Sequence, residues 1–240
     1  MIKAQHIGWA HLVFHPYITR LIRRHFHSLY LMKEFPRIDP GVPILLLPNH
    51  STWWDGFFIY LLNHYGLRRP LYLMMLEEQL SKYPFFAKLG AYSIDPGRPK
   101  SVLETMKYTQ SILASPQTPA PLVCLFPQGK MQPVSVKTLK IRPGYEWLLK
   151  NLQTEIIPLI LGIRAEFLEQ QQPEVFFQFS TFPREESLAP ENIQRVLENI
   201  LGEMLESILK GNKGNRIAKG RRSVNEMWDS IRMTTKKVKE

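Results

Sequence analysis

The chain has 240 residues, of which 44% are hydrophobic and 22% are charged, and these fractions exclude a disordered, collagen-like or disulfide-stabilised protein. The formal net charge is +10. The excess lies at the ends, because residues 1–38 carry six Lys and Arg against one acidic residue, and residues 211–240 carry nine against three. We therefore expect a nearly neutral body with two basic arms that are attracted to phosphate-rich surfaces.

The sequence predicts no membrane-spanning helix, because it contains no apolar run of about 18 residues. The first residues do not resemble a cleaved signal peptide, since several histidines and Pro16 interrupt their apolar positions. The single cysteine, Cys124, lies inside an apolar run and is expected to be buried and inert. These features indicate a protein that stays in the cytoplasm.

Residues 1–38 are expected to form an amphipathic helical segment, because apolar residues recur at helical spacing from Ile7 to Met32 and most arginines fall between them. One interpretation is a helix that packs on the body and leaves a basic face in solvent. The other is an interfacial helix whose apolar face enters the headgroup region while its arginines meet anionic lipid. Both interpretations can hold along its length.

Residues 39–210 have the pattern of an α/β domain, in which short apolar runs alternate with longer helical segments. We expect a single domain with a central mixed sheet flanked by helices. The predicted strands lie near residues 43–48, 71–76, 91–94, 121–126, 156–161 and 174–180. The predicted helices cover residues 55–66, 77–89, 99–114, 143–152 and 189–210.

Residues 211–240 are expected to form a basic flexible tail, because the stretch from Gly211 is rich in glycine and has few groups that could build a core. Apolar residues at helical spacing between Val224 and Met233 indicate a short helix within this tail.

A histidine and a carboxylate form the most informative pair in the chain. His50 directly follows a predicted strand, and Asp55 begins the next predicted helix. Ligands of open α/β sheets gather at the carboxyl ends of strands. A carboxylate that accepts from one imidazole nitrogen leaves the other free to take a proton from a hydroxyl. The alternative is that Asp55 caps the helix and His50 is a structural histidine.

Four blocks of the sequence resemble the glycerolipid acyltransferases, the family of the glycerol-3-phosphate and 1-acylglycerol-3-phosphate acyltransferases. They follow one another in that family's order over about residues 40–165. The blocks are Asn49-His50 with Asp55, Gly90 to Asp95 with Arg98 displaced, Phe126-Pro127-Gln128-Gly129, and Arg142-Pro143-Gly144 with the strand near 156–161. The third block departs from the family, which has glutamate at position 128 and commonly Thr-Arg where Lys130-Met131 stand.

The resemblance implies transfer of a fatty acyl group from acyl-CoA or acyl carrier protein to a hydroxyl of a lysophospholipid or related lipid. His50 would act as the general base and Asp55 would orient it, with no metal and no cofactor besides the thioester. The predicted substrate-binding residues are Asn49, Arg98, Gln128, Gly129, Lys130, Arg142 and Gly144. Lys140 is a further cation that we expect near a phosphate. Backbone N–H groups at the start of the helix at Asp55 or near Gly129 are candidate oxyanion donors.

Two alternatives remain from the sequence. A nucleic-acid-binding protein would explain the basic ends, but the middle of the chain carries no recognisable nucleic-acid-binding signature, so we expect no nucleic-acid partner. A lipid-binding protein with the same fold but no activity would explain the altered third block. We expect the partners to be an anionic membrane surface, a lipid acceptor and, as the alternative donor to acyl-CoA, an acyl carrier protein, with the protein attached peripherally.

Overall fold

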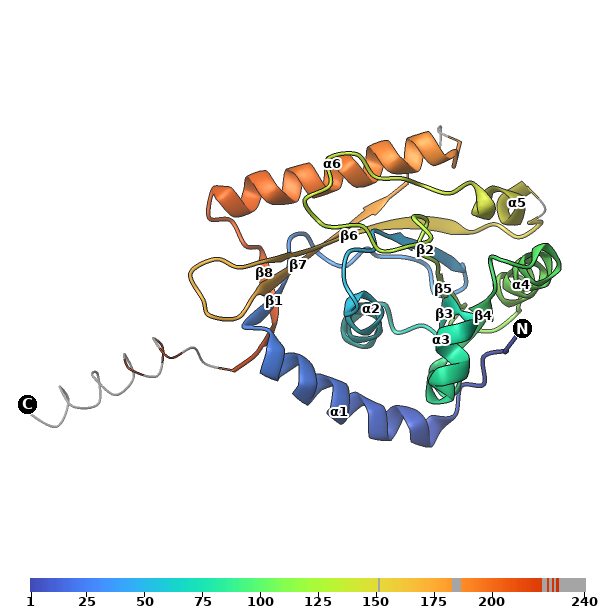
Figure 1. Cartoon of the computed structure of the whole chain (residues 1–240), viewed down its shortest axis with the longest axis horizontal. Coiled ribbons are helices and arrows are strands. Elements are labelled where there is room, and N and C mark those ends of the chain that lie inside the picture. The colour runs from blue at the N-terminus through green and yellow to red at the C-terminus, as the bar shows by residue number, and fades with distance from the viewer. Residues whose placement is uncertain (151, 183–186, 222–223, 225, 227, 229–240) are drawn as a thin grey trace, which may run out of the picture.

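The computed structural model describes residues 1–150, 152–182 and 187–221, together with residues 224, 226 and 228. An eight-stranded sheet lies at its centre, with helices on both faces (Figure 1). The strands are β1 Ser28–Leu31, β2 Ile44–Pro48, β3 Leu71–Leu76, β4 Ala91–Ile94, β5 Leu122–Cys124, β6 Ile157–Glu166, β7 Glu174–Thr181 and β8 Asn215–Lys219. Their order across the sheet is β4-β3-β5-β2-β6-β7-β1-β8.

The helices lie close to the predicted positions. They are α1 Gly8–His25, α2 Asp55–Leu62, α3 Glu77–Lys82, α4 Pro99–Leu113, α5 Gly144–Lys150 and α6 Pro190–Leu209. A π-helical turn, Asn63–Leu67, continues α2, and a 3-10 turn, Pro84–Leu89, follows α3. The predicted α/β class is therefore confirmed, and the helices expected at 55–66 and 77–89 each change geometry before they end.

The sheet is mixed, as predicted. Strands β4, β3, β5, β2 and β6 run parallel, β7 is antiparallel to β6, and β1 is parallel to β7. The carboxyl ends of the five parallel strands consequently meet at one edge of the sheet, where ligands bind in folds of this kind.

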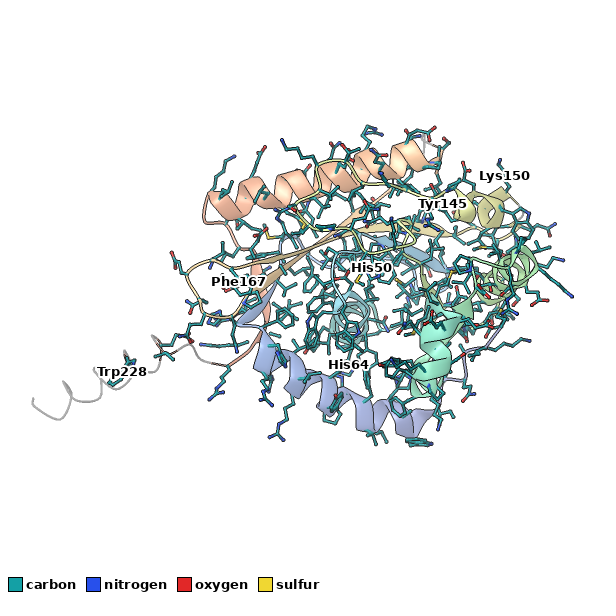
Figure 2. The ribbon with its side chains drawn as sticks, viewed as in Figure 1. His50, His64, Tyr145, Lys150, Phe167 and Trp228 are labelled. Carbon is teal, nitrogen blue, oxygen red and sulfur yellow. The ribbon has the colours of Figure 1, made fainter. Side chains whose placement is uncertain are left out.

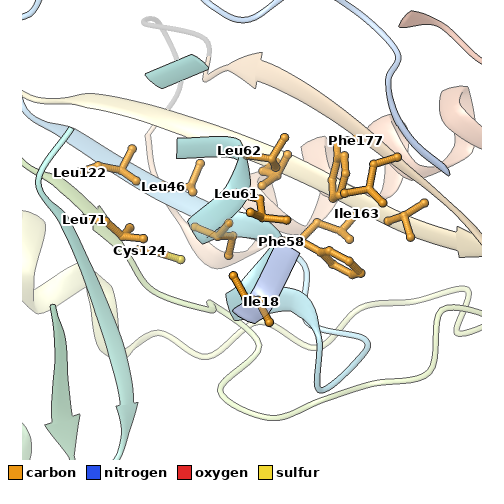
Figure 3. Packing of buried hydrophobic residues seen from close by; sticks show 14 of the residues in the cluster. Ile18, Leu46, Phe58, Leu61, Leu62, Leu71, Leu122, Cys124, Ile163 and Phe177 are labelled. Carbon is orange, nitrogen blue, oxygen red and sulfur yellow. The ribbon is translucent and has the colours of Figure 1, made fainter. Parts of the chain in front are cut away.

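Two apolar cores lie on opposite faces of the sheet. Ile44 and Leu46 of β2 belong to the core under α1 and α2, while Leu45 and Leu47 belong to the core under α4, α5 and α6. This alternation follows from the two-residue period of a strand whose faces are both covered. Figure 3 shows Phe58 and Ile18 in the first core, close to residues of the sheet.

The N-terminal helix is shorter than predicted. It ends at His25, and Ser28–Leu31 form β1 inside the sheet, between β7 and β8. The spacing of Phe26 and Leu29 fits a helix, but hydrogen bonds from strands on both sides favour the extended form. The segment 1–38 is therefore not helical throughout.

The start of the predicted flexible tail is also part of the sheet. β8 pairs antiparallel with β1, and Lys213 Nζ lies 2.7 Å from a carboxylate oxygen of the buried Glu174. This pairing corrects the prediction for Asn215–Lys219. The helix expected between 224 and 233 falls outside the described residues apart from 224, 226 and 228. Within the described residues, no helix has the length and apolar character needed to cross a membrane.

Candidate active site

His50 and Asp55 lie in contact across the loop that joins β2 to α2. His50 Nδ1 is 2.8 Å from Asp55 Oδ2, although five positions separate the two residues in sequence. The His50 side chain is 23% exposed and Asp55 is fully buried. Figure 2 shows His50 near the middle of the molecule, between α6 on one side and α1 on the other. The predicted contact between imidazole and carboxylate is therefore present.

Asp55 accepts four hydrogen bonds, which fix the orientation of its carboxylate. Besides His50, the donors are the N–H groups of Ser51 and Thr52 at 2.7 and 2.9 Å and Thr52 Oγ1 at 2.6 Å. With Nδ1 donating to Asp55, the neutral imidazole keeps its lone pair on Nε2. Nε2 has no hydrogen-bond partner in the described part of the chain. The arrangement can therefore accept a proton from a hydroxyl placed beside Nε2.

The ring and backbone of His50 are held by the segment after β5. The Phe126 ring stacks on the imidazole with a centroid distance of 4.0 Å. Gln128 is buried, and its Oε1 accepts a 2.5 Å hydrogen bond from the His50 N–H. The Gln132 N–H donates to the His50 carbonyl at 2.9 Å. Gln128 thus contacts the backbone of the loop, which differs from the predicted contact with substrate.

Asn49 also contacts backbone. Its side chain is almost fully buried, its Nδ2 donates to the Ile163 carbonyl at 3.0 Å, and its Oδ1 accepts from the Ile163 N–H at 2.7 Å. These two bonds tie the start of the loop to β6. Both polar atoms of the amide therefore have a backbone partner, and Asn49 holds the loop in place.

Arg98 is separated from His50. It follows β4, which is three strand positions from β2, or roughly 14 Å at the usual strand spacing. Its guanidinium pairs with Asp95 at 2.5 Å and with Glu77 at 2.8 Å. The hydrogen bond from Arg98 lowers the pKa of Asp95, and a further bond from the Gly97 N–H adds to this effect. The structure does not bring Arg98 together with the histidine.

Gly129 occupies a turn that requires glycine. Its φ is +68°, and a Cβ at this position would meet Arg142 Cδ at 2.6 Å. Gly129 and Arg142 are therefore neighbours, although 13 positions separate them in sequence. Gly144 is the first residue of α5, and a side chain there would meet open space. Lys130, Lys140 and Arg142 are exposed.

The expected oxyanion donors are largely occupied. At the start of α2, the Asp55 N–H donates to the Thr52 carbonyl at 3.3 Å and the Phe57 N–H donates to the Trp54 carbonyl at 2.9 Å. The Gly129 N–H donates to the Phe126 carbonyl at 3.0 Å. These groups are therefore unavailable to an oxyanion in this conformation. The described residues contain no group of three or more His, Cys, Asp or Glu suited to a metal ion.

Two residues of the site were missed at the sequence level. Thr52 lies between His50 and Asp55, and a hydroxyl three residues before a carboxylate indicates a local hydrogen bond. Phe126 opens the third block, but its stacking on His50 depends on β5 lying next to β2.

Cys124 is buried as predicted. Burial, and to a smaller extent the charge of Asp55, raises the pKa of its thiol.

A sequence model that describes the acyltransferases matches residues 29–162, which is more than half of the chain. The chain belongs to the acyltransferase family. The matched region begins in β1, ends in β6 and contains His50, Asp55 and the third block. The resemblance of the four blocks is thereby confirmed, and the protein is an acyltransferase enzyme. A comparison of this chain with curated proteins gives no sequence match.

Proposed function

We propose that the acyltransferase moves a fatty acyl group from a thioester, acyl-CoA or acyl carrier protein, to a hydroxyl of a lysophospholipid or related lipid. His50 is the general base, and Asp55 orients it. The observation that carries this proposal is the 2.8 Å contact between His50 Nδ1 and a buried carboxylate that three further donors hold in place.

The proposed reaction has two steps. His50 Nε2 takes the proton of the acceptor hydroxyl while the hydroxyl oxygen attacks the thioester carbonyl carbon, and the carbonyl electrons move to its oxygen. The tetrahedral intermediate then collapses, the C–S bond breaks, and the thiolate takes the proton from the His50 imidazolium. Asp55 stabilises the imidazolium between the two steps. The products are an ester and a free thiol.

We also propose that the enzyme attaches to an anionic membrane surface through the outer side of α1. Trp9, Leu12, Val13 and Tyr17 are exposed on this helix, with Leu12 at 79%. The exposed arginines of the same helix, Arg20, Arg23 and Arg24, follow in its second half. An apolar surface next to cations suits the boundary between acyl chains and anionic headgroups. Such attachment is peripheral and brings the enzyme to its lipid acceptor.

The proposed general base is tested by His50→Ala. The purified variant is incubated with labelled acyl-CoA and a membrane lipid extract, and the labelled lipid is identified and quantified. We expect transfer to fall by about 10²–10⁴-fold, the usual contribution of a general base. His25→Ala, which removes an exposed histidine at the end of α1, should leave transfer near the parent level. Near-parent transfer by His50→Ala would remove His50 from the mechanism.

A further inference from the structure

A basic loop lies beside the catalytic histidine. It runs from Gly129 to Pro143, between β5 and α5, and contains no acidic residue. Its four cations are Lys130, Lys137, Lys140 and Arg142, all of which are exposed. Within the residues that the structure describes, none of the four pairs with a carboxylate. The loop therefore presents uncompensated positive charge to a ligand.

Hydrogen bonds connect this basic loop to the active site and to one face of the sheet. The Gln132 N–H donates to the His50 carbonyl. The Gln132 side chain closes the loop, because its Nε2 donates to the Lys140 carbonyl at 2.9 Å and its Oε1 accepts from the Lys140 N–H at 3.0 Å. The Leu139 N–H donates to Glu198 of α6 at 2.8 Å. The basic loop thus has a defined position next to His50, on the α6 side.

The apolar surface of α1 lies on the opposite side of the sheet. α1 packs in the core that includes α2, while Leu139 of the basic loop packs in the core that includes α6. Figure 1 shows the same arrangement, with α1 and α6 on either side of the sheet. His50 therefore lies between a surface suited to lipid and a surface suited to a soluble anion.

We propose that the basic loop binds the phosphate groups of coenzyme A when acyl-CoA serves as the donor. This inference rests on the acyl transfer proposed above. Coenzyme A carries a pyrophosphate and a ribose phosphate at the end of a long pantetheine arm, so its charges lie away from the thioester. The four cations of the loop complement the charge of these phosphates, and Arg142 can bind a phosphate through two N–H groups.

The alternative occupant is an acidic carrier protein. A specific protein interface buries about 800 Å² on each partner and has a largely apolar centre. The basic loop instead presents four exposed cations, and its exposed large apolar side chains are Met131 and Val136. The structure therefore favours coenzyme A.

The direct test measures binding of coenzyme A itself by calorimetry, without any acyl transfer. The loop variant carries Lys130→Gln, Lys137→Gln, Lys140→Gln and Arg142→Gln. A matched control removes four exposed cations elsewhere, through Arg37→Gln, Arg68→Gln, Lys107→Gln and Lys210→Gln. We expect the Kd for coenzyme A to rise at least tenfold in the loop variant and to stay within twofold of the parent in the control. Equal binding by parent and loop variant overturns the inference.

A kinetic comparison separates this inference from the proposed function. Acyl-CoA is compared with the S-acyl pantetheine that carries the same acyl chain but no nucleotide. We expect the loop variant to have a higher KM for acyl-CoA and an unchanged KM for acyl pantetheine. If the parent transfers only from acyl carrier protein and binds no coenzyme A, the inference fails while acyl transfer stands. If the parent binds coenzyme A but transfers from no thioester, the proposed function fails instead.

Discussion

Gln128 illustrates how one buried side chain fixes the loop that carries His50, the proposed general base. Its Oε1 accepts from the His50 N–H at 2.5 Å, and its Nε2 lies 3.5 Å from the His50 carbonyl oxygen. The family has glutamate here, and a carboxylate accepts from the N–H but has no proton to offer the carbonyl. The main effect of glutamine at position 128 is therefore on the position of the His50 backbone, because both polar atoms of its side chain face that backbone.

Replacing Gln128 should alter turnover more than acceptor binding. Gln128→Ala leaves the His50 N–H without its buried partner, at a cost of about 1–3 kcal/mol. We expect kcat to fall by about 10- to 100-fold while KM for the lipid acceptor changes less than twofold. Gln128→Glu keeps the acceptor oxygen and should lose less. Steady-state kinetics with varied acceptor measures both values, and a large rise in KM with unchanged kcat would instead assign Gln128 to substrate binding.

At the scale of elements, histidines line the contact between α1 and the body. The His15 and His64 rings are tilted by 33° with centroids 3.9 Å apart, and the His6 ring centroid lies 4.4 Å from that of Tyr72 and 6.3 Å from that of His11. Burial, followed by the charge of His11, lowers the pKa of His6 to about 4. Burial also lowers the pKa values of His11 and His15. Burial therefore favours the neutral form of these imidazoles.

This packing predicts a loss of stability in mild acid. The unfolded chain binds protons at these histidines near pH 6.5, whereas folded His6 resists protonation until about pH 4. The contribution of His6 to the free energy of unfolding is present above pH 6.5 and is lost as the pH falls towards 4. We expect His6→Asn to reduce the difference in unfolding free energy between pH 7.5 and 5 by about 1–2 kcal/mol, measured by urea denaturation.

Two features make this variant informative. The φ of His6 is +51°, and asparagine tolerates this backbone conformation better than most residues. His25→Asn is the matched control, because His25 is exposed and should leave the pH dependence unchanged. If both variants show the parent's pH dependence, the N-terminal histidines do not determine acid stability.

At the scale of the whole molecule, the enzyme has two different faces. The α1 side exposes apolar side chains and arginines, while the α6 side carries the basic loop. His50 lies at the edge of the sheet between them. This division fits the proposed function, in which a lipid acceptor and a thioester donor arrive from different phases.

The proposed membrane contact of α1 is tested by placing negative charge on its exposed side. Leu12→Glu together with Val13→Glu introduces carboxylates at exposed positions, so the core is unaffected. We expect co-sedimentation with anionic vesicles to weaken at least tenfold, since both apolar contact and attraction to the headgroups decrease. Leu209→Glu changes an equally exposed leucine at the end of α6 and should leave binding unchanged. If vesicle binding weakened equally in the two variants, α1 would have no special role in membrane attachment.

The sequence predicted the parts of the site that depend on short spacing. His50 and Asp55 could be paired because a strand end and a helix start fix both ends of a six-residue loop. It could not show that Asn49 and Gln128 bind backbone, because their partners lie on β6 and in the His50 loop, which are distant in sequence. For the same reason it could not show that Arg98 lies apart from these residues, since the sheet order separates β4 from β2.

The sequence by itself determined the α/β class, most element positions and the histidine-carboxylate pair, because these follow from local periodicity and short loops. Only the tertiary structure decided that Ser28–Leu31 and Asn215–Lys219 are strands, that β1 lies between β7 and β8, and that α1 and the basic loop occupy opposite faces. The physical reason is that sheet pairing satisfies backbone groups through partners far along the chain. No local pattern of side chains specifies those partners.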